Sequence, residues 1–295
     1  MRIALVQCTS GSDKAANLSM VGDRAEEAAS NGADLVVFPE ATMQAFNSGR
    51  LDKQAEPSEG GEAHFAKSVR ELAERLGVVI VLGMFSPAGS VEVDGKTINR
   101  VANMALITGR GLHEKYEKMH CYDAFGFRES DTVRAGSELV TVDVPTSKEA
   151  AAKDRIRVGL AICYDVRFPE HFVELARSGA SLIVLPTSWS DGPGKLEQWR
   201  TLTAARALDA TVYLAAAGQA RPGGEAKAGT DDGPTGIGHS VVVDPTGRRI
   251  AEGGYDEEIL YAEISPGTVT KVQESIPVLA WREEHEAPTG KHGKR

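Results

Sequence analysis

The sequence is poor in cysteine, with three thiols in 295 residues. Cys8, Cys121 and Cys163 are an odd number, and no two of them stand in CxxC spacing. This pattern excludes a disulfide framework and a zinc knuckle, and it indicates reduced thiols.

Long apolar runs are also absent. Four apolar residues follow Arg2 before Gln7 interrupts them, so the start of the chain shows neither a secretory core nor a span of about 20 apolar residues. We therefore expect a cytoplasmic protein without a membrane partner. Basic residues are in deficit, because 33 Lys and Arg face 42 Asp and Glu and give a net charge of -9. This sign argues against nucleic acid as a partner.

Three common catalytic templates are missing. His113-Glu114 lacks the second histidine that the zincin motif HExxH requires. The glycine-rich stretch 233–238 leads into a predicted strand, whereas a dinucleotide fingerprint leads into a helix. No GxSxG nucleophile elbow occurs. The sequence therefore predicts neither a metal nor an organic cofactor.

What the chain does contain is an internal repeat. Residues 2–8 match residues 157–163, and residues 32–39 match residues 179–186 at nearly the same distance behind them. Each half therefore predicts a sheet with helices on one side. Pairing the two bare sheet faces gives an α/β fold, a four-layer αββα sandwich made of two pseudo-symmetric halves.

One composite domain is expected over residues 1–282, followed by a flexible tail over residues 283–295. The polar, lysine-rich residues 144–154 are predicted to link the two halves. Residues 219–238 are rich in glycine and poor in apolar residues, which predicts a long mobile loop.

One of the repeated strands, residues 158–162, leads directly to Cys163, and Pro169 and Glu170 then open a predicted helix. A thiol at a strand-to-helix junction can have a lowered pKa and can be reached by a substrate. The alternative is a structural cysteine buried in the core. This stretch alone does not decide between the two.

Glu40 lies at the end of the strand that begins near Asp34. In the second half, Thr187 occupies the equivalent position. Because mirror-related strand ends converge, Glu40 and Cys163 are predicted to meet at the pseudo-twofold axis. A partly desolvated carboxylate has a raised pKa and can serve as a general base. The alternative is a surface glutamate that caps a helix or forms an ion pair.

Lys118 and His120 follow the last strand of the first half. Lys118 is either a fixed cation that stabilises a thiolate and an oxyanion or a structural ion-pair partner. His120 offers a rival mechanism, a Cys-His dyad with Cys163. The surrounding motif supplies no evident partner to orient its ring.

Together these motifs resemble the nitrilase superfamily of carbon-nitrogen hydrolases, and within it the amidase branch that includes omega-amidase and deaminated glutathione amidase. Phe-Pro-Glu40 is similar to the family's glutamate motif, Tyr-Glu-Lys118-Met-His to its lysine motif, and Gly-Leu-Ala-Ile-Cys163-Tyr-Asp to its nucleophile motif. The resemblance implies the αββα fold, with Cys163 as nucleophile, Glu40 as general base and Lys118 as the oxyanion cation. It also implies that Glu129 positions the lysine.

The resemblance further implies hydrolysis of a small linear carboxamide to carboxylate and ammonia, without a cofactor. A homodimer or larger homo-oligomer is expected, with the apolar residues 276–281 near its contacts. The alternative is that these residues pack on their own subunit. Arg167 either binds the carboxylate of an omega-amide of a dicarboxylic or 2-oxo acid or pairs with Glu170 or Asp165. The expected substrate-binding residues are Tyr164, Arg167, Trp189 and His120.

Two segments differ from the amidases that the motifs resemble. Residues 191–199 are longer, and residues 221–236 are unusual in composition. Both are expected to border the substrate, so they leave its identity open. Cys163-Tyr-Asp favours amides over nitriles. A nitrilase, a thioester-based acyltransferase and a non-catalytic binding protein on the same scaffold are the alternatives.

Overall fold

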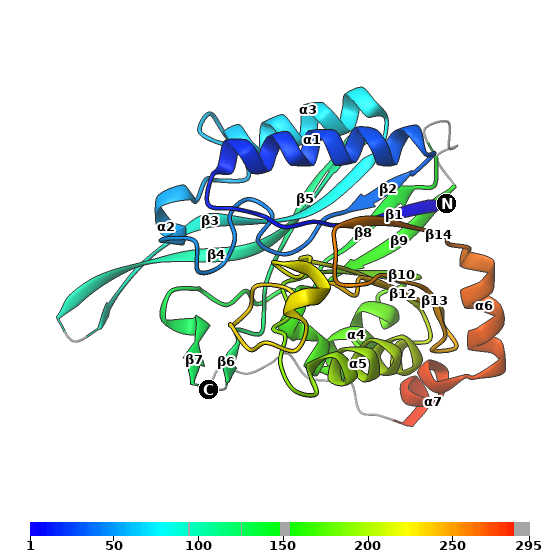
Figure 1. Cartoon of the computed structure of the whole chain (residues 1–295). Helices are drawn as coiled ribbons and strands as arrows, with labels where there is room; N and C mark the ends of the chain where they lie inside the picture. Colours follow the sequence, from blue (N-terminus) through cyan, green and yellow to red (C-terminus); the bar gives the residue numbers. More distant parts are fainter. Residues whose placement is uncertain (94, 125, 148–153, 286–295) are drawn as a thin grey trace.

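Two six-stranded mixed sheets form the centre of the molecule in the computed structural model, which describes residues 1–93, 95–124, 126–147 and 154–285 (Figure 1). The first sheet contains, in spatial order, β14 (Glu258–Glu263), β1 (Arg2–Gln7), β2 (Leu35–Val37), β3 (Val79–Val93), β4 (Lys96–Gly109) and β5 (Leu112–Glu117). The second contains β13 (Arg249–Glu252), β12 (Val241–Val243), β11 (Tyr213–Gly218), β10 (Leu182–Thr187), β9 (Arg155–Leu160) and β8 (Thr141–Pro145). A separate small hairpin pairs β6 (Asp123–Ala124) with β7 (Phe127–Arg128).

Helices cover the outer face of each sheet (Figure 1). Over the first sheet lie α1 (Lys14–Ser30) and α3 (His64–Leu76), and over the second lie α4 (Pro169–Arg177) and α5 (Lys195–Ala210). Helix α1 begins after Asp13 because the Asp13 carboxylate accepts hydrogen bonds from the N–H groups of Ala15 and Ala16. The shorter elements are α2 (Leu51–Gln54), α6 (Pro266–Ser275), α7 (Val278–His285) and the 3-10 turns η1 (Glu129–Asp131), η2 (Cys163–Arg167) and η3 (Gly224–Lys227).

Side chains alternate along β1 between two apolar cores. Ile3 and Leu5 pack into the core between the sheets, with Val158 of β9 among their neighbours in it. Ala4 and Val6 lie in the core beneath α1 and α3. This alternation is the period of two of a strand that is buried on both faces. The predicted four-layer αββα sandwich is therefore confirmed.

The two sheets share one strand plan. When the first sheet is read from β14 to β5 and the second from β8 to β13, the strands correspond one to one. Strand β1 holds the same position as β9, β2 the same as β10, and β3 the same as β11. The predicted pseudo-symmetric halves are confirmed. The outer strands differ in origin, since β8 directly precedes its half and β14 comes from the far end of the chain.

One predicted segment boundary is wrong. Val144 and Pro145, expected to begin the link between the halves, end β8, in which Val142 and Val144 are buried. Residues 148–153 of that link lie outside the described residues. Helix α7 continues through residues 283–285, which were expected to start the flexible tail, while residues 286–295 lie outside the described residues. A domain end at residue 282 stays a prediction.

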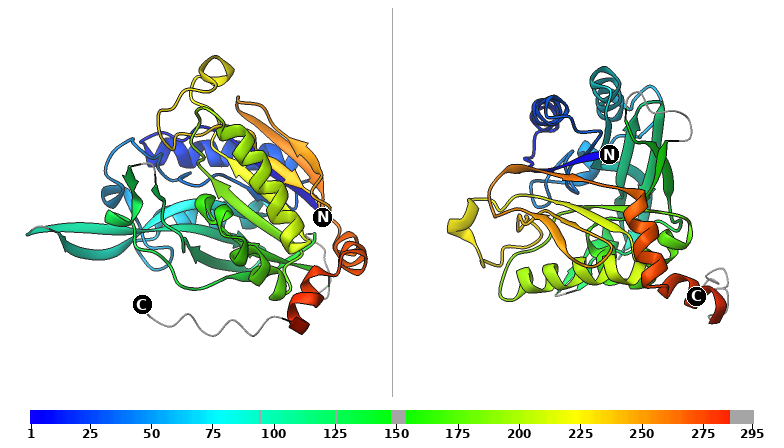
Figure 2. Two further views of the ribbon diagram at one scale, coloured as in Figure 1. Left: turned by 90° about the horizontal axis from the view of Figure 1, so that it is seen from below. Right: turned by 90° about the vertical axis from the view of Figure 1, so that its right-hand side faces the viewer.

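The predicted hairpin near residues 91–98 is the tip of a longer one. Strands β3 and β4 continue well beyond the sheet and project from the molecule (Figure 1). The loop 219–238 also projects, and Figure 2 shows it in yellow. Unlike the predicted mobile loop, it folds around the fully buried side chain of Arg221. Among the described helices, none is both long and apolar enough to cross a membrane.

Candidate active site

Cys163 lies just after β9, on the turn that leads into α4. Its φ of 43° is a left-handed conformation that is uncommon for a residue other than glycine. The Asp165 carboxylate stabilises the turn by accepting a hydrogen bond from the N–H of Ile162 at 2.8 Å. Pro169 then opens α4, where a missing N–H is tolerated. Cys163 is left 8% exposed at the end of an otherwise buried strand.

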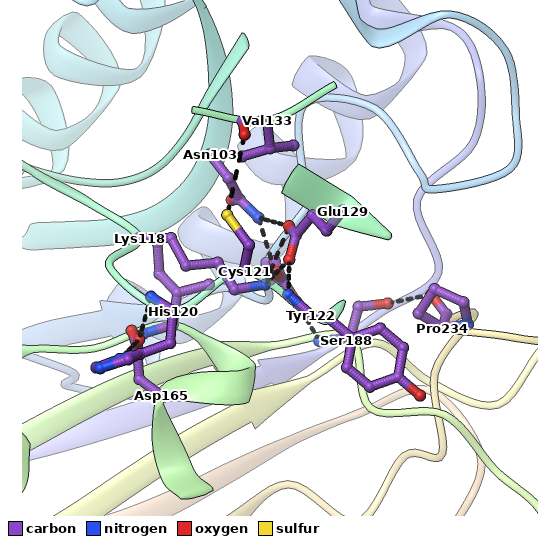
Figure 3. A network of polar contacts seen from close by, with 12 residues as sticks. Asn103, Lys118, His120, Cys121, Tyr122, Glu129, Val133, Asp165, Ser188 and Pro234 are labelled. Carbon is purple, nitrogen blue, oxygen red and sulfur yellow. Dashed lines mark hydrogen bonds and ion pairs between the residues drawn. The ribbon is translucent and has the colours of Figure 1, made fainter. Parts of the chain in front are cut away.

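The other two thiols lie elsewhere. All three cysteines are free, as predicted. Cys8 is fully buried in the core beneath α1 and α3. Cys121 is half-buried, and its thiol points to the carbonyl of Val133 (Figure 3). Of the three, Cys163 is the thiol that lines a cavity.

Glu40 lies in the turn after β2, and its side chain is buried. Gly83 of β3 packs directly against this turn, where its N–H donates to the carbonyl of Pro39 at 2.9 Å. A Cβ at position 83 would lie 2.6 Å from the Glu40 Cα and 2.5 Å from the Ala41 nitrogen. The close approach therefore requires glycine, and it fixes the backbone that carries Glu40.

The ammonium of Lys118 lies between two carboxylates just after β5. Its Nζ donates to Glu40 Oε1 at 3.0 Å and to the two oxygens of Glu129 at 3.1 and 2.9 Å. Asn103 of β4 donates from Nδ2 to Glu129 at 3.2 Å, as Figure 3 shows. The same nitrogen donates to Glu40 at 2.8 Å. The N–H of Ser188 donates to Glu40 Oε2 at 3.0 Å. All five residues are buried, so their charges interact in a site largely free of water.

Burial controls how this group is protonated. It raises the pKa of Glu40, and Lys118 and Asn103 offset only part of that effect. It lowers the pKa of Lys118, but the charges of Glu129 and Glu40 prevail and raise this pKa well above its usual value.

The pKa of Cys163 lies well above its usual value, because burial and the nearby Glu40 charge outweigh Lys118. The direction is opposite to the lowering that a strand-to-helix junction can produce, because the junction is buried. Burial therefore favours the neutral thiol of Cys163, with Glu40 beside it in the same cavity wall.

A cavity lies beside these residues. Glu40, Lys118, Glu129 and Cys163 all contribute to its wall. Tyr164, Arg167 and Trp189 extend the wall, joined by Phe46, Ser188 and Pro234. The structure thus brings together every predicted site residue except His120. Since the wall combines residues of both halves, the predicted convergence of the two halves is found.

His120 lies outside this cavity, where Asp165 orients it. Its Nδ1 lies 2.7 Å from Asp165 Oδ1, and its backbone N–H donates to the same oxygen at 3.2 Å. Its ring stacks on Phe168 with centroids 3.7 Å apart. The orienting partner that the rival dyad lacked in the sequence thus exists, but neither contact involves Cys163.

Asp165 ties the lysine motif to the nucleophile turn. In addition to its bonds from His120 and Ile162, it accepts a hydrogen bond from the hydroxyl of Tyr116 at 2.7 Å. The same hydroxyl accepts a bond from the N–H of Met119 at 3.0 Å. One buried carboxylate therefore sets the spacing between the Lys118 segment and Cys163.

Among the residues that the structure describes, His120, Asp165 and His171 form the one cluster of possible metal ligands. Their potential ligand atoms lie within 4.8 Å of one another. Both oxygens of Asp165 are engaged by hydrogen bonds, and His171 Nε2 lies 3.2 Å from the carbonyl of Leu160. These contacts fit a hydrogen-bonded frame better than a metal centre.

Arg167 reaches the cavity from the end of η2. Its Nη2 donates to Gln198 at 2.9 Å, and its guanidinium lies 5.0 Å from the ring centroid of Trp189. Its Nε is buried without a hydrogen-bond partner. Within the described chain it pairs with neither Asp165 nor Glu170, so the predicted structural alternative is wrong.

Sequence reasoning missed three residues of this site. Asn103 is the one amide in an apolar stretch of β4, which is a signal that could have been used. Ser188 follows Thr187, the counterpart of the Glu40 position, so the repeat pointed to its place. Asp165 belongs to the nucleophile motif, but its role depends on partners distant in the sequence.

An αββα sandwich whose two halves enclose a buried cysteine, glutamate and lysine has the architecture of a hydrolase of carbon-nitrogen bonds. The chain belongs to the carbon-nitrogen hydrolase family, whose model matches residues 2–274. It is similar to a hydrolase of Mycobacterium tuberculosis, with 46% identity over 286 residues that cover 95% of this chain and 94% of the relative.

Two further relatives carry more specific names. A deaminated glutathione amidase of Escherichia coli is 34% identical over 254 residues, which cover 86% of each chain. The omega-amidase Nit3 of Saccharomyces cerevisiae is 30% identical over 295 residues, which cover 96% of this chain and 93% of the relative. The crystal structure of yeast Nit3, a member of branch 10 of the nitrilase superfamily, superposes with a TM-score of 0.75 over 94% of each chain.

Proposed function

We propose that the protein hydrolyses a small linear carboxamide to a carboxylate and ammonia through a thioester on Cys163. The observation that carries this proposal is the contact between Glu40 and Lys118 at 3.0 Å, buried in the same cavity wall as the thiol. A base and a cation held beside a neutral thiol supply what acyl transfer from an amide requires. The names of the amidase relatives support the same reaction.

The reaction begins with proton transfer from Cys163 to Glu40 as the sulfur attacks the amide carbon. The oxyanion that forms is stabilised by the Lys118 ammonium and the N–H of Tyr164, each contributing about 3 kcal/mol. Glu40 returns the proton to the departing ammonia, and the C–N bond breaks to leave the thioester. Glu40 then takes a proton from water as the water oxygen attacks the thioester, and it returns this proton to the sulfur as the C–S bond breaks. The product leaves as the carboxylic acid, which ionises in solution, and both the thiol and the Glu40 carboxylate are restored. Glu129 holds Lys118 in place, and no step requires a cofactor.

Arg167 gives the substrate its proposed second charge. Its buried Nε has no partner in the described protein, and the guanidinium faces the cavity between aromatic rings. A carboxylate would complete these hydrogen bonds, which favours an omega-amide of a dicarboxylic or 2-oxo acid. Arg167→Lys should raise KM for acidic amides by about tenfold and leave neutral amides unchanged. Equal effects on both would exclude this role.

The reaction is tested by ammonia release from a panel of short omega-amides, 2-oxo amides and deaminated glutathione. Cys163→Ala and Glu40→Gln should each abolish release while the protein stays folded. Full activity of Cys163→Ser would contradict a thioester.

A nitrile paired with each amide separates a nitrilase from an amidase. Hydroxylamine added as acceptor separates an acyltransferase, which would form hydroxamate in preference to carboxylate. A folded protein that binds the amides without turning any of them over would be a binding protein on this scaffold.

We also propose a homodimer or larger homo-oligomer in a reducing compartment such as the cytoplasm. Ile276 and Trp281 are 40% and 58% exposed near the end of the described chain, and apolar side chains of this size favour burial against another subunit. Light scattering of the wild type and Trp281→Glu tests this. An unchanged mass for both would remove Trp281 from the interface.

A further inference from the structure

Residues 191–199 and 221–236, the two segments expected to differ from the amidases that the motifs resemble, meet at one buried arginine. The Arg221 side chain is fully buried in the loop 219–238 and forms a bidentate pair with Asp232, with distances of 2.7 and 3.0 Å. It also donates to the Thr235 hydroxyl and to the carbonyls of Lys227 and Thr230, all at 3.1 Å. Arg221 is therefore the centre around which this loop folds.

Asp191 connects that centre to the other unusual segment. Its carboxylate lies 3.4 Å from Arg221 Nε and accepts hydrogen bonds from the N–H groups of Gly192 and Gly229, both at 2.7 Å. Asp191 is buried and lies two residues after Trp189 of the cavity wall. Arg221 and Asp191 thus fasten the two segments to each other.

The fastened loop reaches the candidate active site through Pro234. The carbonyl of Pro234 accepts a hydrogen bond from the Ser188 hydroxyl at 2.7 Å (Figure 3), and the N–H of Ser188 bonds to Glu40. Pro234 follows Asp232 by two residues and precedes Thr235, both of which Arg221 holds. The position of Pro234 in the cavity wall therefore depends on Arg221.

A second cavity adjoins the first. It is lined by Ser10, Gln219 and Thr235 among others, and it shares Phe46, Ser188 and Pro234 with the first cavity. These three shared residues form the partition between the two spaces. If Pro234 moved away, the spaces would join, and the enlarged cavity would hold a longer chain.

We propose that Arg221 is a specificity-determining positioning residue. By holding Pro234 in the partition, it limits the length of the acyl chain that the cavity beside Cys163 accepts. This inference rests on the proposed amidase function and adds a preference for short acyl chains to it. Arg221 touches neither the reacting atoms nor the substrate, and acts through the loop.

The test compares the chain-length profiles of Arg221→Gln and the milder Asp232→Asn with the wild type. The substrates are monoamides of linear dicarboxylic acids, from the four-carbon to the eight-carbon member. We expect KM for the shortest amides to rise about tenfold, and kcat/KM for the longest to gain about tenfold relative to the shortest. Asp232→Asn should change both in the same direction by less.

Arg110→Gln is the matched control. Arg110 is also nearly buried and pairs with Asp34 at 3.1 Å, but it lines neither cavity. It should lower the melting temperature without changing the chain-length profile. A profile that is unchanged in Arg221→Gln and Asp232→Asn, or a kcat that falls equally for every length at constant KM, would overturn the proposal.

Binding separates this inference from the proposed function. In a Cys163→Ala background, calorimetry with the same amides should show the same shift toward long chains when Arg221→Gln is added. If the Cys163→Ala protein binds the amides but the wild type does not hydrolyse them, the amidase proposal is wrong. The dissociation constants would then decide the role of Arg221. If that background binds no member of the series, the role of Arg221 is overturned, while ammonia release by the wild type still decides the amidase proposal.

Discussion

Replacing Glu129 by Gln tests whether the buried charges act as one unit. The substitution keeps the side-chain size but removes the carboxylate that gives Lys118 two of its hydrogen bonds, at 3.1 and 2.9 Å. It also turns an amide donor toward the ammonium or weakens the bond from the N–H of Tyr122. Removing one partner of a buried ion pair costs about 3 to 5 kcal/mol. Since 1 kcal/mol lowers the melting temperature of a large domain by about 2 to 4 °C, we expect a fall of about 10 °C.

The same change should lower the rate. The charge of Glu129 contributes to the raised pKa of Glu40, so its loss makes Glu40 a weaker base. Lys118 is then left to pair with Glu40 alone, which draws the cation away from the oxyanion. A general base contributes about a hundredfold or more to the rate, and we expect kcat to fall by about that factor.

Glu117→Gln is the matched control, one residue away from Lys118. Glu117 pairs with Arg134 at 2.8 Å, but the two side chains are 27% and 48% exposed. Such a surface pair contributes at most about 1 kcal/mol. Melting curves and initial rates of both variants check the reasoning. Equal shifts in melting temperature, or full activity of Glu129→Gln, would show that Lys118 does not depend on a buried counter-charge.

Three further results are expected. Because the pKa of Glu40 is raised, kcat/KM should rise with pH through a midpoint above about 4.3, the ordinary value for glutamate; a midpoint at or below it would exclude Glu40 as the base. Gly83→Ala should lower both kcat and stability, by about 1 to 3 kcal/mol for the latter, whereas Gly22→Ala, with open space around its Cβ, should not. Despite burial, hydrogen bonds hold the pKa of Asp165 below its usual value, so its bonded carboxylate stabilises the fold above about pH 3.9 and less as the pH falls further. Asp165→Asn should therefore have a lower melting temperature than the wild type at pH 7, and the difference between the two melting temperatures should become smaller at acidic pH.

The parts of the fold that the sequence predicted are those with local signals. The apolar runs of β1, β2, β9 and β10 are short, strongly hydrophobic and repeated, so both the strands and their correspondence could be identified. The pseudo-symmetry then predicted that Glu40 and Cys163 meet. The outer strand β8 was missed because it has only five residues and leads into the polar link. Strand β14 was missed because its alternation is weak and its partner β1 lies more than 250 residues away.

The parts of the site that could not be predicted depend on tertiary environment. The pKa of Cys163 follows from burial, which the strand-to-helix junction does not reveal. Asn103 bridges two carboxylates that are 63 and 26 residues distant from it in the chain. Arg221 lies in a polar, glycine-rich loop, where an arginine normally faces solvent. Its burial arises from partners in that loop and from Asp191, which lies outside it.

A duplicated fold could in principle hold two sites, yet the differences between the halves leave material for one. Thr187 at the end of β10 is the counterpart of Glu40, which follows β2 in the first half. The N–H of its neighbour Ser188 donates to the Glu40 carboxylate at 3.0 Å. Cys8 after β1 is the counterpart of Cys163, which follows β9 in the second half. Cys8 is buried beneath the helices and pairs through its backbone with Gln219. Gln219 in turn donates to the carbonyl of Glu40 at 2.9 Å. The positions that would have formed a second site therefore hold Glu40 of the first, one through its carboxylate and the other through its backbone carbonyl. The loss of symmetry is what gives Glu40 its fixed, buried position.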